Sequence, residues 1–141
     1  MTAELDTRDR PSAAARIRHR LLAIAVAVAA PIVVWIVASV AGVGFEVTSP
    51  AIGTLTIDVP LVIVSTIPLA LAAWGVLALL ERRTPRARTI WTVIAIAVLV
   101  LSLPPLALLD ATIATKVALG IMHLAAGVPL ILMLRHGARD A

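Results

Sequence analysis

The sequence lacks cysteine and tyrosine altogether, and only 3% of its 141 residues are aromatic. Without cysteine the chain has no disulfide framework, no thiol chemistry and no sulfur ligand for a metal. The shortage of aromatic rings argues against a protein that stacks ligands or binds carbohydrate. Charged residues are also scarce, at 14% of the chain. These absences remove several common kinds of enzyme and binding site.

Apolar residues dominate what remains. They make up 61% of the chain and raise its mean hydropathy to +1.05, which excludes a soluble fold. Four apolar runs each approach the ~20 residues that a bilayer span requires. We therefore predict an all-α membrane protein, a four-transmembrane-helix antiparallel bundle. The predicted spans are about 21–42, 60–80, 89–109 and 112–134, within a domain at 21–135 that is flanked by a flexible basic tail at 1–20 and a short tail at 136–141.

A different periodicity follows the first span. Apolar and polar residues alternate between 43 and 59, which is typical of β-strands, and residues 49–53 supply a turn with proline and glycine. We predict a short extracytoplasmic β-hairpin between the first and second spans. Its bundle-facing residues are expected to be Phe45, Val47, Leu55 and Ile57. Glu46 and Asp58 would share the wet face, as solvated charges in preference to a cation site or an acid–base pair.

Positive charge is distributed very unevenly about the apolar runs. Lys116 lies at one side of the predicted membrane, and the other eleven of the 12 basic residues lie at the opposite side. These eleven are Arg8, Arg10, Arg16, Arg18, Arg20, Arg82, Arg83, Arg86, Arg88, Arg135 and Arg139. The net charge of +4 would suggest nucleic acid as the partner of a soluble protein, but the positive-inside rule explains it better. We expect a multi-pass protein of the cell membrane with both termini cytoplasmic and no nucleic-acid partner.

The first span also resembles a signal peptide, with Ser39-Val40-Ala41 in place of a cleavage site. It is longer than the ~7–15 residues of a signal h-region and contains Pro31, so we expect it to be retained. Pro31 should kink or loosen the helix. Trp35 lies deep enough that its indole should need an internal acceptor.

The ends of the last two spans carry further signals. Pro104 and Pro105 should end or bend the third helix early, and either Thr112 or Asp110 can cap the fourth. On the third span, Ala95, Val98 and Ser102 share one stripe, which we predict to face inward.

His123 is the ionisable residue placed near the middle of the last apolar run. At 3.6 residues per turn, one stripe of that helix carries Lys116, Gly120, His123 and Gly127. Glycines on both sides of an imidazole allow a neighbouring backbone to approach and turn the ring toward protein. The opposite stripe, which should face lipid or bulky neighbours, is Val117, Ile121, Leu124, Val128 and Leu132.

The rise of 1.5 Å per residue puts His123 at the depth of Ser102 and Pro31. We predict that a neutral His123 points into the bundle, near the Ser102 hydroxyl and the Ala27 carbonyl that Pro31 leaves without a donor. With Thr66 and Lys116, these side chains form the predicted intramembrane polar cluster of His123, Ser102, Thr66 and Lys116. We identify no catalytic residue and no metal ligand set.

Four segments carry a resemblance to a known family: Pro31 with Trp35, WGVLALLERR at 74–83, WTVIAIAVLVLSLPPL at 91–106, and Met122-His123-Leu124. They resemble the small four-helix membrane proteins of actinobacterial type grouped as domain-of-unknown-function family 6069. The resemblance extends over about 21–135. It implies a four-span membrane protein and carries over no activity, cofactor or site residue.

Three functions remain open. We favour a non-enzymatic accessory, assembly or partner-binding subunit without a cofactor, whose partners are the bilayer and either a membrane protein or another copy of the chain. A transporter or channel for a small solute or proton would use His123, Ser102 and Thr66 as a polar track. A haem protein would use His123 as an axial ligand, and only a dimer could place two such imidazoles across one haem. A membrane hydrolase lacks a nucleophile and base at one depth.

The charge asymmetry predicts on which side of the membrane each loop lies. A cysteine introduced at Thr54 should react with a membrane-impermeant reagent in intact cells, and one at Arg86 should react only after lysis. The reverse pattern of labelling would show that the orientation is inverted.

Overall fold

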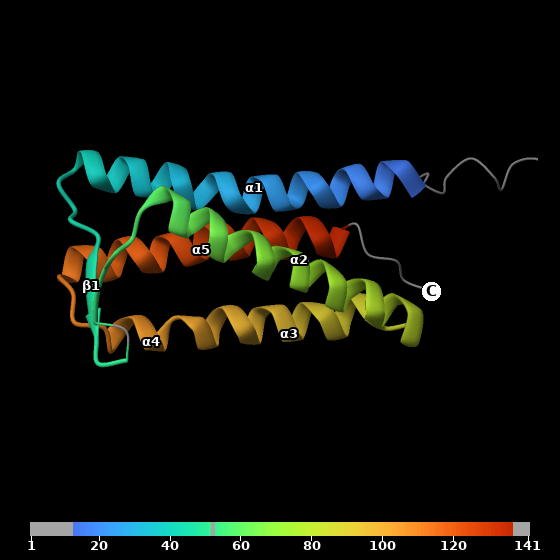
Figure 1. Ribbon diagram of the computed structural model, residues 1–141. Helices are drawn as coiled ribbons and strands as arrows, with labels where there is room; N and C mark the ends of the chain where they lie inside the picture. The colour runs from blue at the N-terminus through green and yellow to red at the C-terminus, as the bar shows by residue number, and fades with distance from the viewer. Residues whose placement is uncertain (1–12, 52, 137–141) are drawn as a thin grey trace, which may run out of the picture.

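The computed structural model describes residues 13–51 and 53–136 (Figure 1). Four helical stretches are each long and apolar enough to cross a membrane, the third counted from Ala87 to Ala107, and a small hairpin lies between the first two, which confirms the predicted architecture. The elements in chain order are α1 (Ala13–Val40), β1 (Glu46–Ser49), β2 (Gly53–Thr56), α2 (Val59–Arg83), α3 (Ala87–Ser102), α4 (Pro104–Ala107) and α5 (Ile113–His136).

The helices run antiparallel, so the hairpin lies at one end of the bundle and the start of α1 lies at the other with the end of α5 (Figure 1). We call these the hairpin end, residues 41–58 and 108–112, and the arginine end, residues 13–20, 81–88 and 135–136. Helix α1 packs most extensively against α5 and less against α2. Helix α3 packs against α2 and α5. The cycle of neighbours is therefore α1, α2, α3 and α5.

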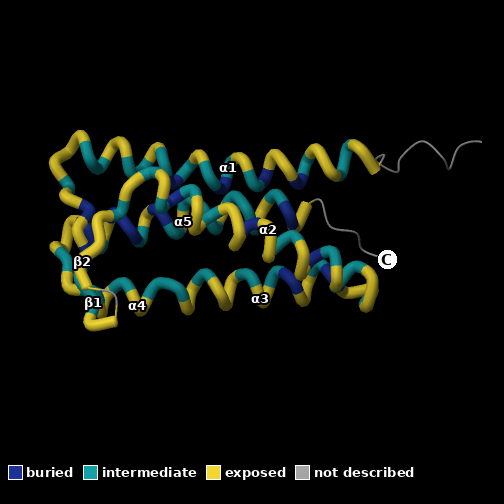
Figure 2. The backbone as a smooth tube through the Cα atoms, viewed as in Figure 1, coloured by how far each residue is buried: buried dark blue, intermediate teal, exposed yellow. Residues whose placement is uncertain are grey.

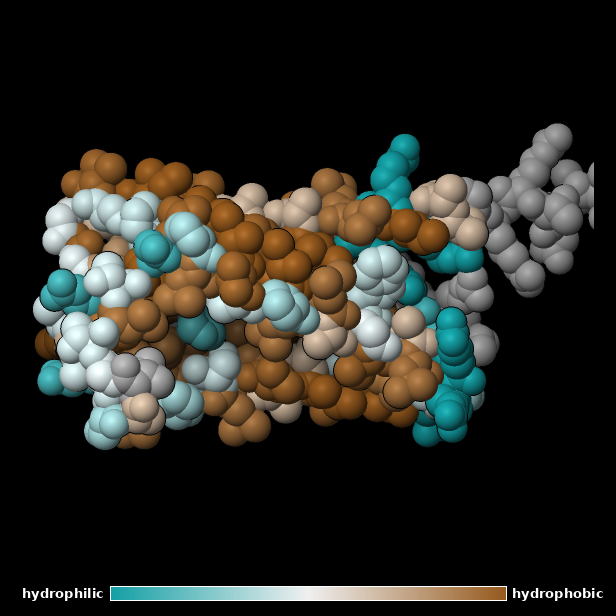
Figure 3. All heavy atoms as spheres, viewed as in Figure 1, coloured by the Kyte–Doolittle hydropathy of each residue, from teal (hydrophilic) through white to brown (hydrophobic). Residues whose placement is uncertain are grey.

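The hydropathy of the surface also changes along the length of the bundle. Apolar residues predominate over the middle of the visible face, and hydrophilic residues gather at both ends (Figure 3). The stripe of α5 predicted to face lipid, from Val117 to Leu132, is exposed. Such an apolar belt between two polar rims is the surface that a bilayer requires.

Two apolar cores hold the helices together, one toward each end, and both are buried between the elements (Figure 2). The core under the hairpin consists of Phe45, Val47, Val62, Ala118, Leu119 and Met122. The core near the arginine end consists of Ala23, Leu77, Trp91 and Leu134, one residue from each long helix. The Trp91 indole also donates to the Ala73 carbonyl (2.9 Å), which joins α3 to α2.

Helix α1 starts earlier than the sequence indicates. The predicted flexible tail ended at Arg20, but residues 13–20 are helical. Two contacts explain this difference. The Arg20 guanidinium donates to Glu81 of α2 (2.6 Å), and the His19 ring bonds to the Met133 carbonyl of α5 (2.8 Å), so this part of α1 is held by two other helices. Residues 1–12, the rest of the predicted tail, and 137–141 of the C-terminal tail lie outside the described residues.

The other end of α1 closes with a glycine. Gly42 has φ +87, and its N–H donates to the Ser39 carbonyl while the N–H of Val43 donates to that of Ala38, both at 3.0 Å. This paired arrangement is the Schellman motif, which satisfies the last carbonyls of a helix and turns the chain away from its axis. It directs the chain into the hairpin.

The hairpin forms where predicted, with Val47 opposite Leu55. Phe45 and Val47 are buried and Ile57 is half-buried, as expected. Leu55 lies on the same face of the hairpin as its partner Val47, as predicted, but it remains 38% exposed. The reason is that the backbone of Thr48 in β1 pairs with Asp110, so β1 lies between that connection and β2, and β2 is left at the outer edge.

Three contacts fix the hairpin to the helices. The Trp35 indole, which needed an acceptor, donates to the Ile57 carbonyl (2.8 Å) and stacks on Phe45 with ring centroids 5.7 Å apart. Because that acceptor belongs to the hairpin, Trp35 lies nearer to the hairpin end than we predicted. The N–H groups of Thr48 and Asp110 each donate to the other's carbonyl, at 2.9 and 3.0 Å.

Asp58 makes the third contact. It is exposed, as expected, but its carboxylate also accepts from the Leu61 N–H (2.9 Å) and caps α2. A carboxylate at a helix N-terminus satisfies a free N–H and faces the positive end of the dipole.

The double proline does end the third helix early. Helix α3 stops at Ser102, and the single turn α4 follows after Leu103. The predicted inward stripe is wrong at one position, because Val98 is 52% exposed and Leu99 is the half-buried residue. The indole bond of Trp91 to α2 fixes the rotation of α3 about its own axis. The inward stripe therefore runs from Trp91 through Ala95 to Leu99.

The bond from Trp35 to the hairpin gives a stability prediction. Trp35→Phe keeps an aromatic ring next to Phe45 but loses the N–H donor, so the free energy of unfolding in detergent should fall by about 1 kcal/mol. Trp74→Phe is the matched control, because the Trp74 indole makes no hydrogen bond within residues 13–51 and 53–136. Equal losses of unfolding free energy in the two variants would show that the indole hydrogen bond does not stabilise the fold.

Candidate functional site

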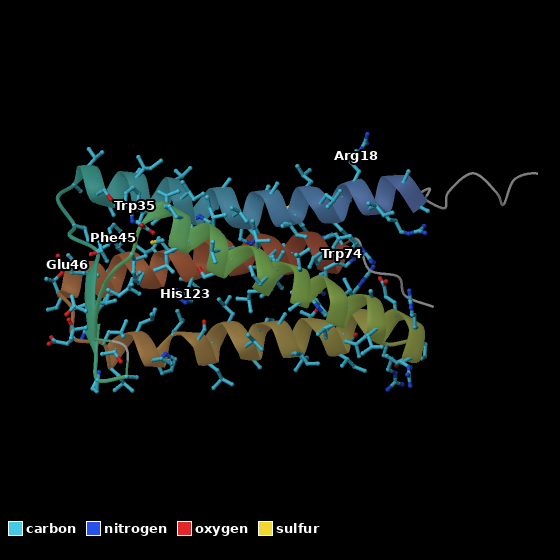
Figure 4. The ribbon with its side chains drawn as sticks, viewed as in Figure 1. Arg18, Trp35, Phe45, Glu46, Trp74 and His123 are labelled. Carbon is cyan, nitrogen blue, oxygen red and sulfur yellow. The ribbon has the colours of Figure 1, made fainter. Side chains whose placement is uncertain are left out.

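The polar stripe of α5 faces α3, as its glycines suggested. Helix α3 comes close at Gly127, where a Cβ atom would lie 2.6 Å from Cδ1 of Leu99. His123 lies one turn away on the same stripe, is half-buried, and points from α5 toward α3 in Figure 4. The prediction that His123 points into the bundle is thus confirmed.

The hydrogen bond of His123 differs from the one expected. Its Nδ1 donates to the Leu119 carbonyl, one turn earlier in its own helix, at 2.9 Å. A carbonyl only accepts, so Nδ1 carries the proton in this bond. The described residues show no bond from His123 to Ser102 or to the Ala27 carbonyl, which were its predicted partners. Bonding within α5 needs no partner helix, because the carbonyl at i−4 is always within reach.

The other members of the predicted polar cluster have separate partners. The Ser102 hydroxyl donates to the Leu99 carbonyl (2.7 Å), and the Lys116 ammonium donates to the Ala107 carbonyl (3.0 Å). Thr66 is half-buried on α2. No hydrogen bond joins any two of the four residues in the part of the chain that the structure describes. Lys116 extends to the hairpin end, as expected, and satisfies the last carbonyl of α4.

A third face of α5 was missed by the sequence analysis. Thr115, Ala118, Leu119 and Met122 are buried, and residues of α1 including Ile32 and Ala38 pack against the cluster that most of them form. Thr115 is 0% exposed, and its hydroxyl bonds to that of Thr112 (2.8 Å). Thr112 also accepts from the Thr115 N–H, so Thr112 caps α5. Apart from Thr115, this face carries apolar residues like those of the stripe facing lipid, so the sequence gave no sign that it contacts α1.

Histidines lie at two levels only. His19 and His136 are at the arginine end, bonded to backbone carbonyls of α5, and His123 is in the middle. No group of three His, Asp or Glu residues that could hold a metal occurs within 13–51 and 53–136.

The arginine end contains a charged site that the sequence analysis did not find. Arg20 and Glu81 form an ion pair between α1 and α2, and both side chains are largely buried, with 10% and 13% of their surface exposed. A groove of about 310 Å³ lies against this pair. Its polar lining is Arg16, Arg20, Glu81 and Arg82. Arg20 falls in the predicted flexible tail and Glu81 directly after the predicted second span, and only the antiparallel packing of α1 and α2 brings them together.

The fold and its surface define a multi-pass membrane protein built on four helices. The chain belongs to a family of unknown function, DUF6069, which matches residues 11–140. No curated protein and no solved structure matches the chain. The family membership inferred from the four resembling segments is therefore confirmed, and the function must be argued from the geometry.

The close approach of α3 to α5 can be tested with alanine. At Gly127 the new methyl group collides with Leu99, whereas at Gly120 it meets nothing within 4 Å. Both changes gain the same helix propensity, so Gly127→Ala should be less stable than Gly120→Ala by about 1–3 kcal/mol, the usual cost of overpacking. Chemical unfolding in detergent measures the difference. Equal stabilities would mean that Leu99 moves aside without cost.

Proposed function

We propose that this protein is a non-enzymatic accessory or assembly subunit of the cell membrane that binds an extended segment of a partner protein along β2. One observation carries the proposal: the hairpin is fixed to the bundle through Trp35, Asp110 and Asp58, while all four residues of β2 are exposed. A strand that is held rigidly and left open is suited to recognition by strand addition.

The backbone of β2 presents unpaired N–H and C=O groups at the open edge. The Ile57 N–H donates to the Phe45 carbonyl (2.8 Å), and the Thr48 N–H turns the other way, toward Asp110. The backbone N–H and C=O groups of successive strand residues point in alternate directions. Those of Leu55 therefore point toward β1, whereas those of Thr54 and Thr56 point outward. Unpaired groups of this kind form a template for another strand.

The contacts inside the membrane support a role without chemistry. His123, Ser102 and Ser65 each donate to a carbonyl of their own helix, at 2.7–2.9 Å. Hydroxyl and imidazole groups used in this way stabilise their own backbone in an apolar environment. These hydrogen bonds stabilise the individual helices, and the bundle of helices holds the hairpin in place.

The orientation follows from charge and belongs to the same proposal. The arginine end lies in the cytoplasm with both termini, since basic residues are retained on that side. The hairpin then projects from the opposite face, and the partner has its binding segment there.

The open edge can be tested by a proline exchange. A photoreactive residue at Thr54, expressed in the native host, should give a discrete crosslinked product. Thr56→Pro removes an edge N–H without breaking the ladder to β1, so it should lower the yield roughly fivefold, the effect of losing one hydrogen bond.

Thr56→Ala is the matched control, because it removes the same side chain and keeps the N–H. It should leave the yield unchanged. Equal yields from the proline and alanine variants would contradict binding at the edge. A product with the mass of two copies of this chain would contradict a different protein as the partner.

A further inference from the structure

The groove at the arginine end is built from matching faces of two helices. Helix α1 contributes Arg16, Ile17 and Arg20, and α2 contributes Ala78, Glu81 and Arg82. The spacing of three and four residues within each set places it on one face of its helix. Because α1 and α2 run antiparallel, the groove lies between the first turns of α1 and the last turns of α2, at the polar rim of the apolar band.

Arg20 forms the deepest charged part of the groove. Its residue surface is only 9% exposed, and its Nη2 donates to Glu81 (2.6 Å). Its Nε is also buried and has no hydrogen-bond partner. A guanidinium has five donors, so one carboxylate oxygen leaves capacity for a further acceptor. Buried donors without partners are rare in proteins and call for an explanation.

The charge of the groove favours an anion. Three arginines, Arg16, Arg20 and Arg82, line it together with one glutamate, Glu81. Guanidinium groups recognise phosphate well, since their planar donors match its oxygens. Arg18, by contrast, points away from the bundle (Figure 4).

Apolar surface adjoins the charged groups. Ile17 is half-exposed in the groove, and Leu21 and Leu22 continue the exposed apolar surface of α1 toward the middle of the membrane. A ligand with a phosphate head and a hydrocarbon tail fits both parts, whereas free phosphate would use only the arginines.

We propose that this groove binds the headgroup of an anionic phospholipid from the leaflet at the arginine end. The phosphate lies among Arg16, Arg20 and Arg82, and an acyl chain follows Ile17 along α1. The site lies at the opposite end from the strand edge and does not depend on the function proposed above.

Competition between lipids tests this site. Purified full-length protein is equilibrated with equal amounts of phosphatidylglycerol and phosphatidylcholine of the same acyl chains, and the retained lipid is measured by native mass spectrometry. The wild type should retain phosphatidylglycerol preferentially. Arg16→Gln with Arg82→Gln should reduce this preference about tenfold, and Arg18→Gln with Arg83→Gln should leave it within about twofold.

The second pair is a matched control, because it removes the same charge from the same two helices outside the groove. Equal loss in both double variants would overturn the proposal in favour of diffuse attraction to charge. If the groove variant does not fold, Arg82→Gln against Arg83→Gln makes the comparison, since both side chains are exposed. Excess inorganic phosphate should not displace the lipid. If it does, the site binds soluble phosphate and the assignment to a lipid is wrong.

Discussion

The need to satisfy polar groups inside an apolar environment shapes most of this structure. A bilayer offers no water to bond a free N–H or C=O, so each group needs a partner within the chain. Within the apolar band, Trp91 and Ser102 each donate to a backbone carbonyl. The pairing continues at the helix ends, which lie at the membrane boundaries. Lys116 supplies a donor to the last turn of α4, His19 supplies one to the end of α5, and Asp58 supplies an acceptor to the start of α2. Several of these contacts join different elements, so they also fix how the elements are arranged.

Contacts with the bundle also explain why the hairpin is stable. Two strands alone are marginal in water. Here the indole of Trp35 and the backbone of Asp110 complete the bonding of β1 and of its neighbour Ile57, and Phe45 and Val47 close the core beneath. Among the described residues, Thr54 and Thr56 on the outer side of β2 have no backbone hydrogen-bond partner. The hairpin is therefore a fixed part of the bundle with one available edge.

The two ends of the bundle differ in what they present. The hairpin end offers backbone groups and small polar side chains, and the arginine end offers guanidinium groups around a buried ion pair. Between them the apolar cores and the approach of Gly127 to Leu99 hold the helices at a fixed spacing. The surfaces with specific chemistry thus lie at the membrane boundaries, while His123, at the centre, bonds to its own helix.

The four spans, the hairpin, the early end of α3 and the cap at Thr112 were determined by the sequence alone. Each follows from local rules: hydrophobic length, alternation, the missing N–H of proline, and a hydroxyl at a helix start. The rotation of each helix about its axis and the pairing of distant side chains were not determined by the sequence alone. Local periodicity leaves neighbouring stripes such as those of Val98 and Leu99 nearly equivalent, and the Trp91 bond to α2 chose between them. Likewise, 61 residues separate Arg20 from Glu81, and nothing in either local sequence indicates the other. Only the tertiary structure decided these contacts, because they depend on which helices are neighbours, and apolar side chains that suit lipid suit almost any helix equally well.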